Sequence, residues 1–202
     1  MDAAGGSGLN CTLKSSPAPS SSDKLGREVL AALEEHGGSG EVVRVVDHRV
    51  RFGVSTDEGD GDEWPTIRQK ILDCDVLVLA TPIWLGQPSS VAKVVLERLD
   101  AELAETDDAG RPILFDKVAL VAVVGNEDGA HHTTAELLQA LSDVGMTIPA
   151  QAATYWVGEA MHGTDYNDLE ESPEGTASTT RTAAANAAHL SGLLRGSGYP
   201  AG

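Results

Sequence analysis

Hydroxyl side chains and a lysine gather in one polar segment near the start of the chain. The segment TLKSSPAPSSSDK, residues 12–24, precedes a stretch with helical spacing. A helix N-terminus offers free N–H groups and a partial positive charge, so with hydroxyl and ammonium donors it can bind a phosphate group. The donors singled out here are Thr12, Lys14, Ser20, Ser21 and Ser22. The same composition is equally typical of a flexible loop with an ordinary serine cap.

A second segment, TPIWLGQP, is apolar where a polar turn would be expected after a buried strand. A flat hydrophobic ligand needs an apolar wall with backbone donors and acceptors at its polar edge. Ile83, Trp84 and Leu85 can form such a wall, and Pro82 and Gly86 can turn backbone amides inward. Packing of Trp84 against a neighbouring helix or another subunit is an equally good interpretation.

The third segment is GNEDGAHH, which follows another apolar run. Its glycines permit close approach of the backbone to a ligand, and two of its polar residues can also cap the next helix. Adjacent histidines on a helix face different directions, so we expect no metal site. His131 is the single candidate for a proton donor or substrate contact, although a surface histidine is the simpler interpretation. The candidate contacts are Asn126, Glu127, Asp128, Gly129 and His131.

Together these segments describe a ligand with an anionic end and a flat, amphipathic body, and flavin mononucleotide (FMN) fits that description. The formal net charge of −17 argues against nucleic acid and anionic membranes as partners, so local donors must hold a bound anion. The two cysteines lack the spacing of a disulfide scaffold or zinc site. The start does not resemble a signal peptide and no apolar run is long enough to span a membrane, so we expect a cytoplasmic protein.

The elements that must position these residues alternate along the chain. The strongest expected strands are 75–80 and 117–125, which are continuous and rich in Val and Leu, as in strands buried on both faces of a parallel sheet. Weaker strands are expected at 9–13, 40–47 and 149–158, and the glycine-rich AAGGSGLNC makes the first strand the poorest. Helical spacing marks residues 25–33, 63–74, 91–103, 135–141 and 173–195.

This alternation predicts one α/β domain over residues 1–202, with a parallel sheet and helices on both faces. We expect residues 1–8 to be disordered or weakly ordered and residues 196–202 to form a tail. Ligands of such sheets bind beyond the carboxyl ends of the strands. The three segments follow the first, third and fourth strands, so they are expected to meet there. A further aromatic segment, TYWVGEAMHGTDYNDLEE, is expected either to pack in the core or to cover a neighbouring subunit's flavin.

The motifs CTLKSSPAPSSSDKL, LVLATPIWLGQPSSVAKVVLERLD and VAVVGNEDGAHH, in this order, resemble the flavodoxin-like NAD(P)H-dependent FMN reductases and related flavodoxin-family oxidoreductases. The resemblance covers residues 9–194. It implies a three-layer flavodoxin-like fold with a five-stranded parallel sheet of order 2-1-3-4-5. It also implies that the first motif binds the phosphate of FMN and that the other two contact the flavin ring.

The resemblance implies an enzyme that takes hydride from NAD(P)H and passes it to a quinone, a flavin or another small acceptor. It also implies a homodimer or homotetramer. The cofactor supplies the chemistry, so backbone amides rather than a catalytic triad are expected to carry the site. A flavodoxin-type one-electron carrier, which the acidic charge would suit, and a flavin-free binding protein of the same fold are the alternatives.

Overall fold

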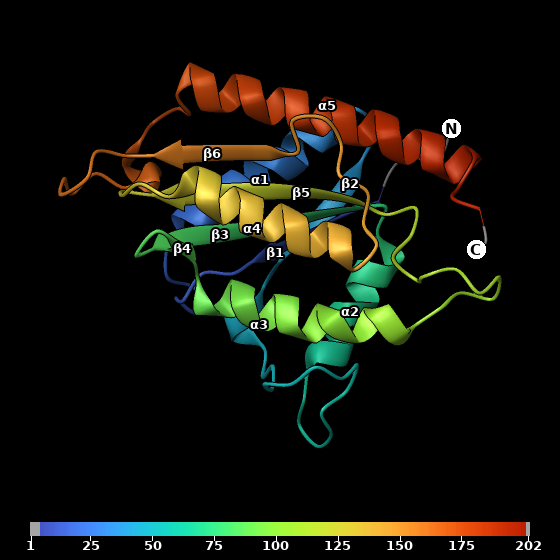
Figure 1. The fold of residues 1–202 in the computed structure, drawn as a ribbon. Helices are drawn as coiled ribbons and strands as arrows, with labels where there is room; N and C mark the ends of the chain where they lie inside the picture. Colours follow the sequence, from blue (N-terminus) through green and yellow to red (C-terminus); the bar gives the residue numbers. More distant parts are fainter. Residues whose placement is uncertain (1–4, 201–202) are drawn as a thin grey trace.

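The computed structural model describes residues 5–200 and shows a parallel sheet between two layers of helices (Figure 1). Residues 1–4 and 201–202, which belong to the expected weakly ordered start and tail, lie outside this description. The strands are β1 (Gly5–Asn10), β2 (Ser39–Arg44), β3 (Val76–Trp84), β4 (Gln87–Pro88), β5 (Val118–Gly125) and β6 (Ala153–Val157). The order is β2-β1-β3-β5-β6 with parallel pairing, and the short β4 pairs antiparallel with the end of β3. Apart from β4, this is the expected 2-1-3-4-5 order, and the expected fold class is confirmed.

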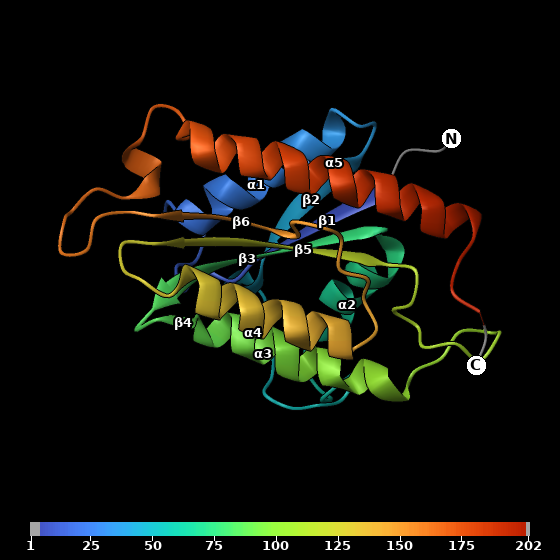
Figure 2. The same cartoon turned by 45° about the horizontal axis from the view of Figure 1, so that its top comes forward.

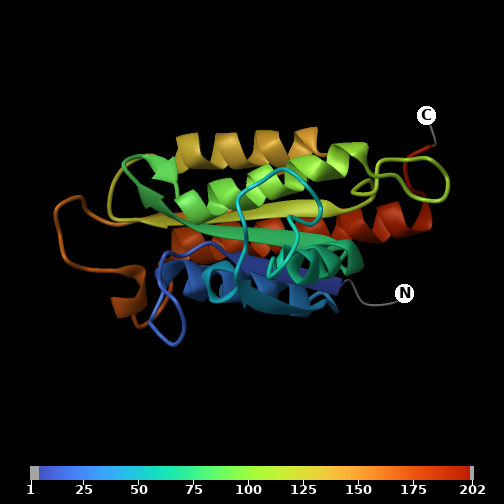
Figure 3. The same ribbon diagram turned by 90° about the horizontal axis from the view of Figure 1, so that it is seen from below.

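Helices cover both faces of the sheet (Figures 1 and 2). One face packs against α1 (Ser21–Glu34) and α5 (Glu174–Gly196), and the other packs against α2 (Trp64–Asp73), α3 (Ser90–Leu99) and α4 (Ala130–Asp143). The central strands are buried on both sides because Leu77 and Leu79 join one core cluster while Val76 and Val78 join the other. Figure 3 shows the loops after β1, β3, β5 and β6 gathered at one end of the sheet.

The chain is ordered closer to both ends than the sequence indicates. Instead of the strand expected at 9–13, β1 begins at Gly5 and lies inside the sheet, so four of the residues expected to be weakly ordered belong to it. At the other end, Tyr199 in the expected tail packs its ring 5.3 Å from that of Phe115.

Two glycines explain why so poor a β-forming segment is an interior strand, between β2 and β3. A Cβ on Gly6 would lie 3.2 Å from Leu30 Cδ2, and a Cβ on Gly8 would lie 3.1 Å from Val42 Cγ2. Glycine therefore lets α1 and the neighbouring strand pack closely against β1. This is a requirement of tertiary packing that strand propensity does not contain.

Two elements end at unexpected residues. The strand β3 continues through Trp84 and forms a hairpin with β4, where a loop was expected after residue 80. The helix α3 ends at Leu99 and a short 3-10 helix, η2 (Asp100–Ala104), follows. Leu103 is consequently 62% exposed rather than part of the buried stripe of α3.

A buried ion pair fastens the long loop between β2 and α2 onto α3. Arg98 Nη2 lies 2.8 Å from Asp62 Oδ2, and both side chains are inaccessible to solvent. Arg98 also donates hydrogen bonds to the carbonyl oxygens of Arg51 and Ser55, and its guanidinium lies over the Trp64 ring. Burial by itself raises the pKa of Asp62, but the hydrogen bonds from Arg98 and three backbone amides hold that pKa well below its usual value.

Candidate functional site

The loops after β1, β3, β5 and β6 enclose a cavity of about 560 Å³ at the carboxyl end of the sheet. Its lining residues are Thr12, Leu13, Lys14, Ser20, Ser21, Ser22, Pro82, Ile83, Trp84, Leu85, Val124, Gly125, Asn126, Glu127, Ala160, Met161 and Asp165. A second cavity of about 630 Å³ lies beside β6 and α5, but none of the described residues that line it is charged. The first cavity lies where ligands bind in sheets of this type, so we take it as the candidate site.

One end of this cavity is the N-terminus of α1. Ser20 caps the helix by accepting a hydrogen bond from the amide of Asp23, at 3.2 Å. The Ser20 and Ser22 hydroxyls lie 3.0 Å apart, and Ser22 donates to Asn10 Oδ1 at 2.9 Å. The same Asn10 oxygen accepts from the amide of Thr12 at 3.2 Å. Asn10, at the end of β1, thus orients both the loop and the helix start.

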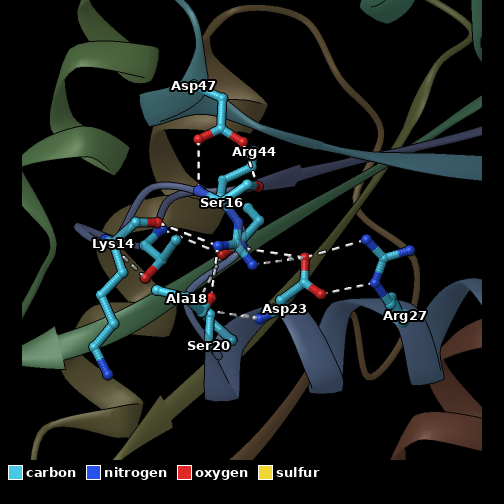
Figure 4. Close-up of polar contacts among 11 residues, drawn as sticks. Lys14, Ser16, Ala18, Ser20, Asp23, Arg27, Arg44 and Asp47 are labelled. Carbon is cyan, nitrogen blue, oxygen red and sulfur yellow. Dashed lines mark hydrogen bonds and ion pairs between the residues drawn. The ribbon is translucent and has the colours of Figure 1, made fainter.

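Arg44, the last residue of β2, and Asp47, in the short 3-10 helix that follows, hold the loop after β1 in place (Figure 4). Arg44 donates to the carbonyl oxygen of Ala18 at 2.8 Å and to that of Lys14 at 3.4 Å. Asp47 accepts from both the amide and the hydroxyl of Ser16, at 2.8 and 2.5 Å, and these bonds lower the pKa of Asp47. The loop is therefore not the flexible segment that its composition also permitted.

The Lys14 ammonium is the cation of this end of the cavity. Figure 4 shows its side chain extending away from the contacts that fix its backbone. Within residues 5–200, Lys14 Nζ has neither a hydrogen bond nor an ion pair. An anion in the cavity would meet the Lys14 ammonium, the serine hydroxyls and the positive end of the α1 dipole together.

The wall of the cavity is the hairpin formed by β3 and β4. Ile83 is buried, whereas Trp84 is 53% exposed and Leu85 is 91% exposed. Leu85 and Gly86 form the turn with φ values of 52° and 73°. Trp84 and Leu85 are therefore exposed because they lie at the turn of the hairpin, and not because they are core residues that fail to pack.

The loop between β5 and α4 forms the other edge. Glu127 Oε1 accepts a hydrogen bond from the Leu85 amide at 2.6 Å, which joins this loop to the hairpin. Asn126 and Glu127 line the cavity. Asp128 and His131 do not: Asp128 accepts a hydrogen bond from the amide of Gly129, and His131 Nε2 lies 3.0 Å from the Tyr155 hydroxyl.

Eleven of the predicted contact residues are brought together and four are not. The eleven that line the cavity are Thr12, Lys14, Ser20, Ser21, Ser22, Pro82, Ile83, Trp84, Leu85, Asn126 and Glu127. The four outside its lining are Gly86, Asp128, Gly129 and His131.

The segment after β6 supplies a part of the lining that the sequence analysis assigned to the core or to a neighbouring subunit. Ala160, Met161 and Asp165 all line the chain's own cavity. Asp165 accepts a hydrogen bond from the Asn126 side chain at 2.9 Å, and the following Tyr166 packs beneath as a fully buried residue. The glycines and acidic residues around Met161 indicated a loop, but no local pattern indicated that this loop lines the chain's own cavity.

The donor set fits FMN. Hydroxyls, one ammonium and a helix N-terminus suit the phosphate, the apolar hairpin suits the ring, and amide and carboxylate groups lie at the far edge. The residues that the structure describes contain no group of three or more His, Cys, Asp or Glu side chains able to hold a metal ion. Among the same residues, no helix is long and apolar enough to cross a membrane.

Fold and site together define a flavodoxin-like flavoprotein. The family model of NADPH-dependent FMN reductases matches residues 11–161, and the chain belongs to this family. This confirms the family that the resemblance indicated.

Two relatives match almost the whole chain. The 8-demethyl-8-aminoriboflavin-5'-phosphate synthase of Streptomyces davaonensis is 36% identical over 201 residues, which are 95% of this chain and 78% of the synthase. The divalent metal cation transporter MntH of Mycobacterium bovis is 37% identical over 194 residues, or 93% of this chain. The chain spans only 28% of that transporter's length.

A solved structure is similar in three dimensions. The crystal structure of RosB with the bound intermediate 8-demethyl-8-formylriboflavin-5'-phosphate gives a TM-score of 0.87 at 35% identity. The match covers 98% of this chain and 82% of RosB.

Proposed function

We propose that this protein is an FMN-dependent oxidoreductase that takes hydride from NAD(P)H and passes it to a quinone, a flavin or another small acceptor. The observation that carries the proposal is the polarity of the cavity. Its α1 end offers hydroxyls and the unpaired Lys14 ammonium, and its hairpin wall is apolar. Donors at one end of the cavity suit a phosphate, and the apolar surface beyond them suits a flat ring joined to it.

Bound FMN would supply hydride acceptance and release, and the chain would supply position and environment. The α1 N-terminus and Lys14 would hold the phosphate, since oriented N–H groups and a cation favour an anion. Ile83 and Trp84 would exclude water from one side of the ring. The exposed Leu85 side chain would offer apolar surface at the mouth to the second substrate.

A second candidate follows from the relatives. The similarity to the named synthase extends over 95% of this chain, and the RosB structure contains a formyl derivative of riboflavin phosphate. In this alternative the same cavity binds FMN as a substrate whose 8-position is modified, rather than as a recycled cofactor.

One incubation separates these functions. The protein is mixed in air with FMN and NADPH, and separately with NADH, with and without free amino acids as nitrogen donors. Dissolved oxygen reoxidises the reduced flavin, and the flavin is then analysed by mass spectrometry. We expect many turnovers of NAD(P)H oxidation with FMN recovered unchanged. Loss of FMN to a product of altered mass would instead support the second candidate. Binding of FMN without NAD(P)H oxidation would support a one-electron carrier and contradict the reductase proposal.

We also propose that the protein forms a homodimer or homotetramer. Exposed apolar side chains surround the cavity mouth: Trp84 is 53% exposed, and Leu85 and Met161 are almost fully exposed. Such a patch is typical of an interaction surface. Sedimentation equilibrium at micromolar concentration checks this proposal, and a monomer would contradict it.

A further inference from the structure

Two segments beside the cavity approach each other at four positions. One is the β3–β4 hairpin, and the other runs from the last residue of β5 to the first turn of α4. The four pairs are Ile83 with Gly125, Leu85 with Glu127, Gly86 with Gly129, and Gln87 with His132. The two segments therefore form one continuous wall rather than two independent loops.

Two of these contacts are possible only because one partner is a glycine, which has no side chain. A Cβ on Gly125 would lie 2.8 Å from Ile83 Cβ, and a Cβ on Gly129 would lie 2.7 Å from the Cα of Gly86. Gly129 also has φ +119°, a conformation that other residues rarely adopt. These contacts set how closely the loops approach, but they supply no directional bond.

The Leu85–Glu127 contact differs because it is a hydrogen bond to a charged acceptor. Leu85 adopts φ 52°, which is unfavourable for a residue with a branched side chain. Its side chain is 91% exposed, so burial does not hold it there. The pairing of Trp84 with Gln87 closes the turn, and the 2.6 Å bond from the Leu85 amide to Glu127 Oε1 is a further contact that can offset this strain.

We propose that Glu127 is a positioning residue that holds the Leu85–Gly86 turn in its cavity-forming conformation before any ligand binds. The turn carries Trp84 and Leu85, so Glu127 sets the apolar wall from the opposite loop. The inference rests on the proposed FMN site and deepens it. It concerns the hydrogen bond rather than the charge, because a glutamine at this position also offers an oxygen acceptor.

The first test uses the ligand-free protein and measures hydrogen exchange of the Leu85 amide by NMR. In Glu127→Ala we expect this amide to exchange about tenfold faster, because its acceptor is lost. In Glu127→Gln we expect exchange within about twofold of wild type, because the acceptor remains. The control is Asp108→Ala, which removes an exposed negative charge in the segment before β5, away from the cavity.

The second test is FMN affinity by quenching of flavin fluorescence. We expect Glu127→Ala to raise the Kd about tenfold and Glu127→Gln, which keeps the oxygen acceptor, to raise it less. The control Asp108→Ala, which lies away from the cavity, should leave the Kd nearly unchanged. Unchanged Leu85 exchange in Glu127→Ala overturns the inference, as does equally fast exchange in both Glu127 variants. If wild type binds no FMN, the proposed function fails, while the exchange measurement still decides the role of Glu127.

Discussion

At the scale of single residues, Lys14 tests whether the phosphate of FMN lies at the α1 end of the cavity. Among residues 5–200 it is the one cation that lines the cavity, and it lies at the α1 end. In Lys14→Met we expect FMN to bind about tenfold more weakly, because a charge-assisted contact to phosphate is lost. Riboflavin, which lacks the phosphate, should bind both proteins equally.

Fluorescence titrations with the two flavins measure the Lys14 effect. Lys93→Met, which removes an exposed charge from α3, is the control for the change in net charge. Equal weakening of FMN and riboflavin by Lys14→Met would show that Lys14 does not contact the phosphate.

Some site residues are predictable from sequence and others are not, for a physical reason. Ser20, Ser21 and Ser22 are predictable because hydroxyls at a helix start have a local role. Arg44 is not, because its contacts with Ala18 and Lys14 arise only from the pairing of β1 with β2. Contacts between segments distant along the chain leave no local pattern.

At the scale of elements, the Asp62–Arg98 pair fastens the loop before α2 onto α3. Removing one partner leaves the other charge buried and uncompensated. Asp62→Ala is therefore expected to lower the free energy of unfolding at neutral pH by about 3 kcal/mol. Chemical denaturation measures the difference. Asp60→Ala, at an exposed position of the same loop, should change it by less than about 0.5 kcal/mol.

The same pair predicts a pH dependence. The pKa of Asp62 is lowered in the folded protein, so its contribution is complete above the unfolded pKa of about 4 and is lost as the pH falls through the folded pKa. The difference in unfolding free energy between wild type and Asp62→Ala should be constant between about pH 5 and 8 and shrink in stronger acid. A difference that grew on acidification would contradict this account.

The elements themselves were largely predictable, because the buried strands β3 and β5 are continuous apolar runs between helical stripes. The exceptions share one cause. The strand β1 is glycine-rich because α1 packs closely on it, and β3 extends beyond residue 80 because it gains a hairpin partner in β4. In both, tertiary contacts override local propensity.

At the scale of the whole molecule, the net charge of −17 opposes an anionic ligand even though the cavity attracts it. Salt screens the long-range repulsion more than the short contacts within the site. The association rate constant of FMN should therefore rise, by about twofold or more, between low and physiological ionic strength, while that of riboflavin stays constant. Stopped-flow fluorescence measures both. A rate for FMN that falls with salt would show that the local cation dominates the encounter.

The central claim is that the cavity at the carboxyl end of the sheet binds FMN for reduction. The most direct measurement is the visible spectrum of the purified protein, titrated with FMN and then with NADPH under anaerobic conditions. The account predicts one FMN bound per chain, with a perturbed absorption band that bleaches when NADPH is added. A protein that leaves the spectrum of added FMN unchanged and binds none of it would contradict the account.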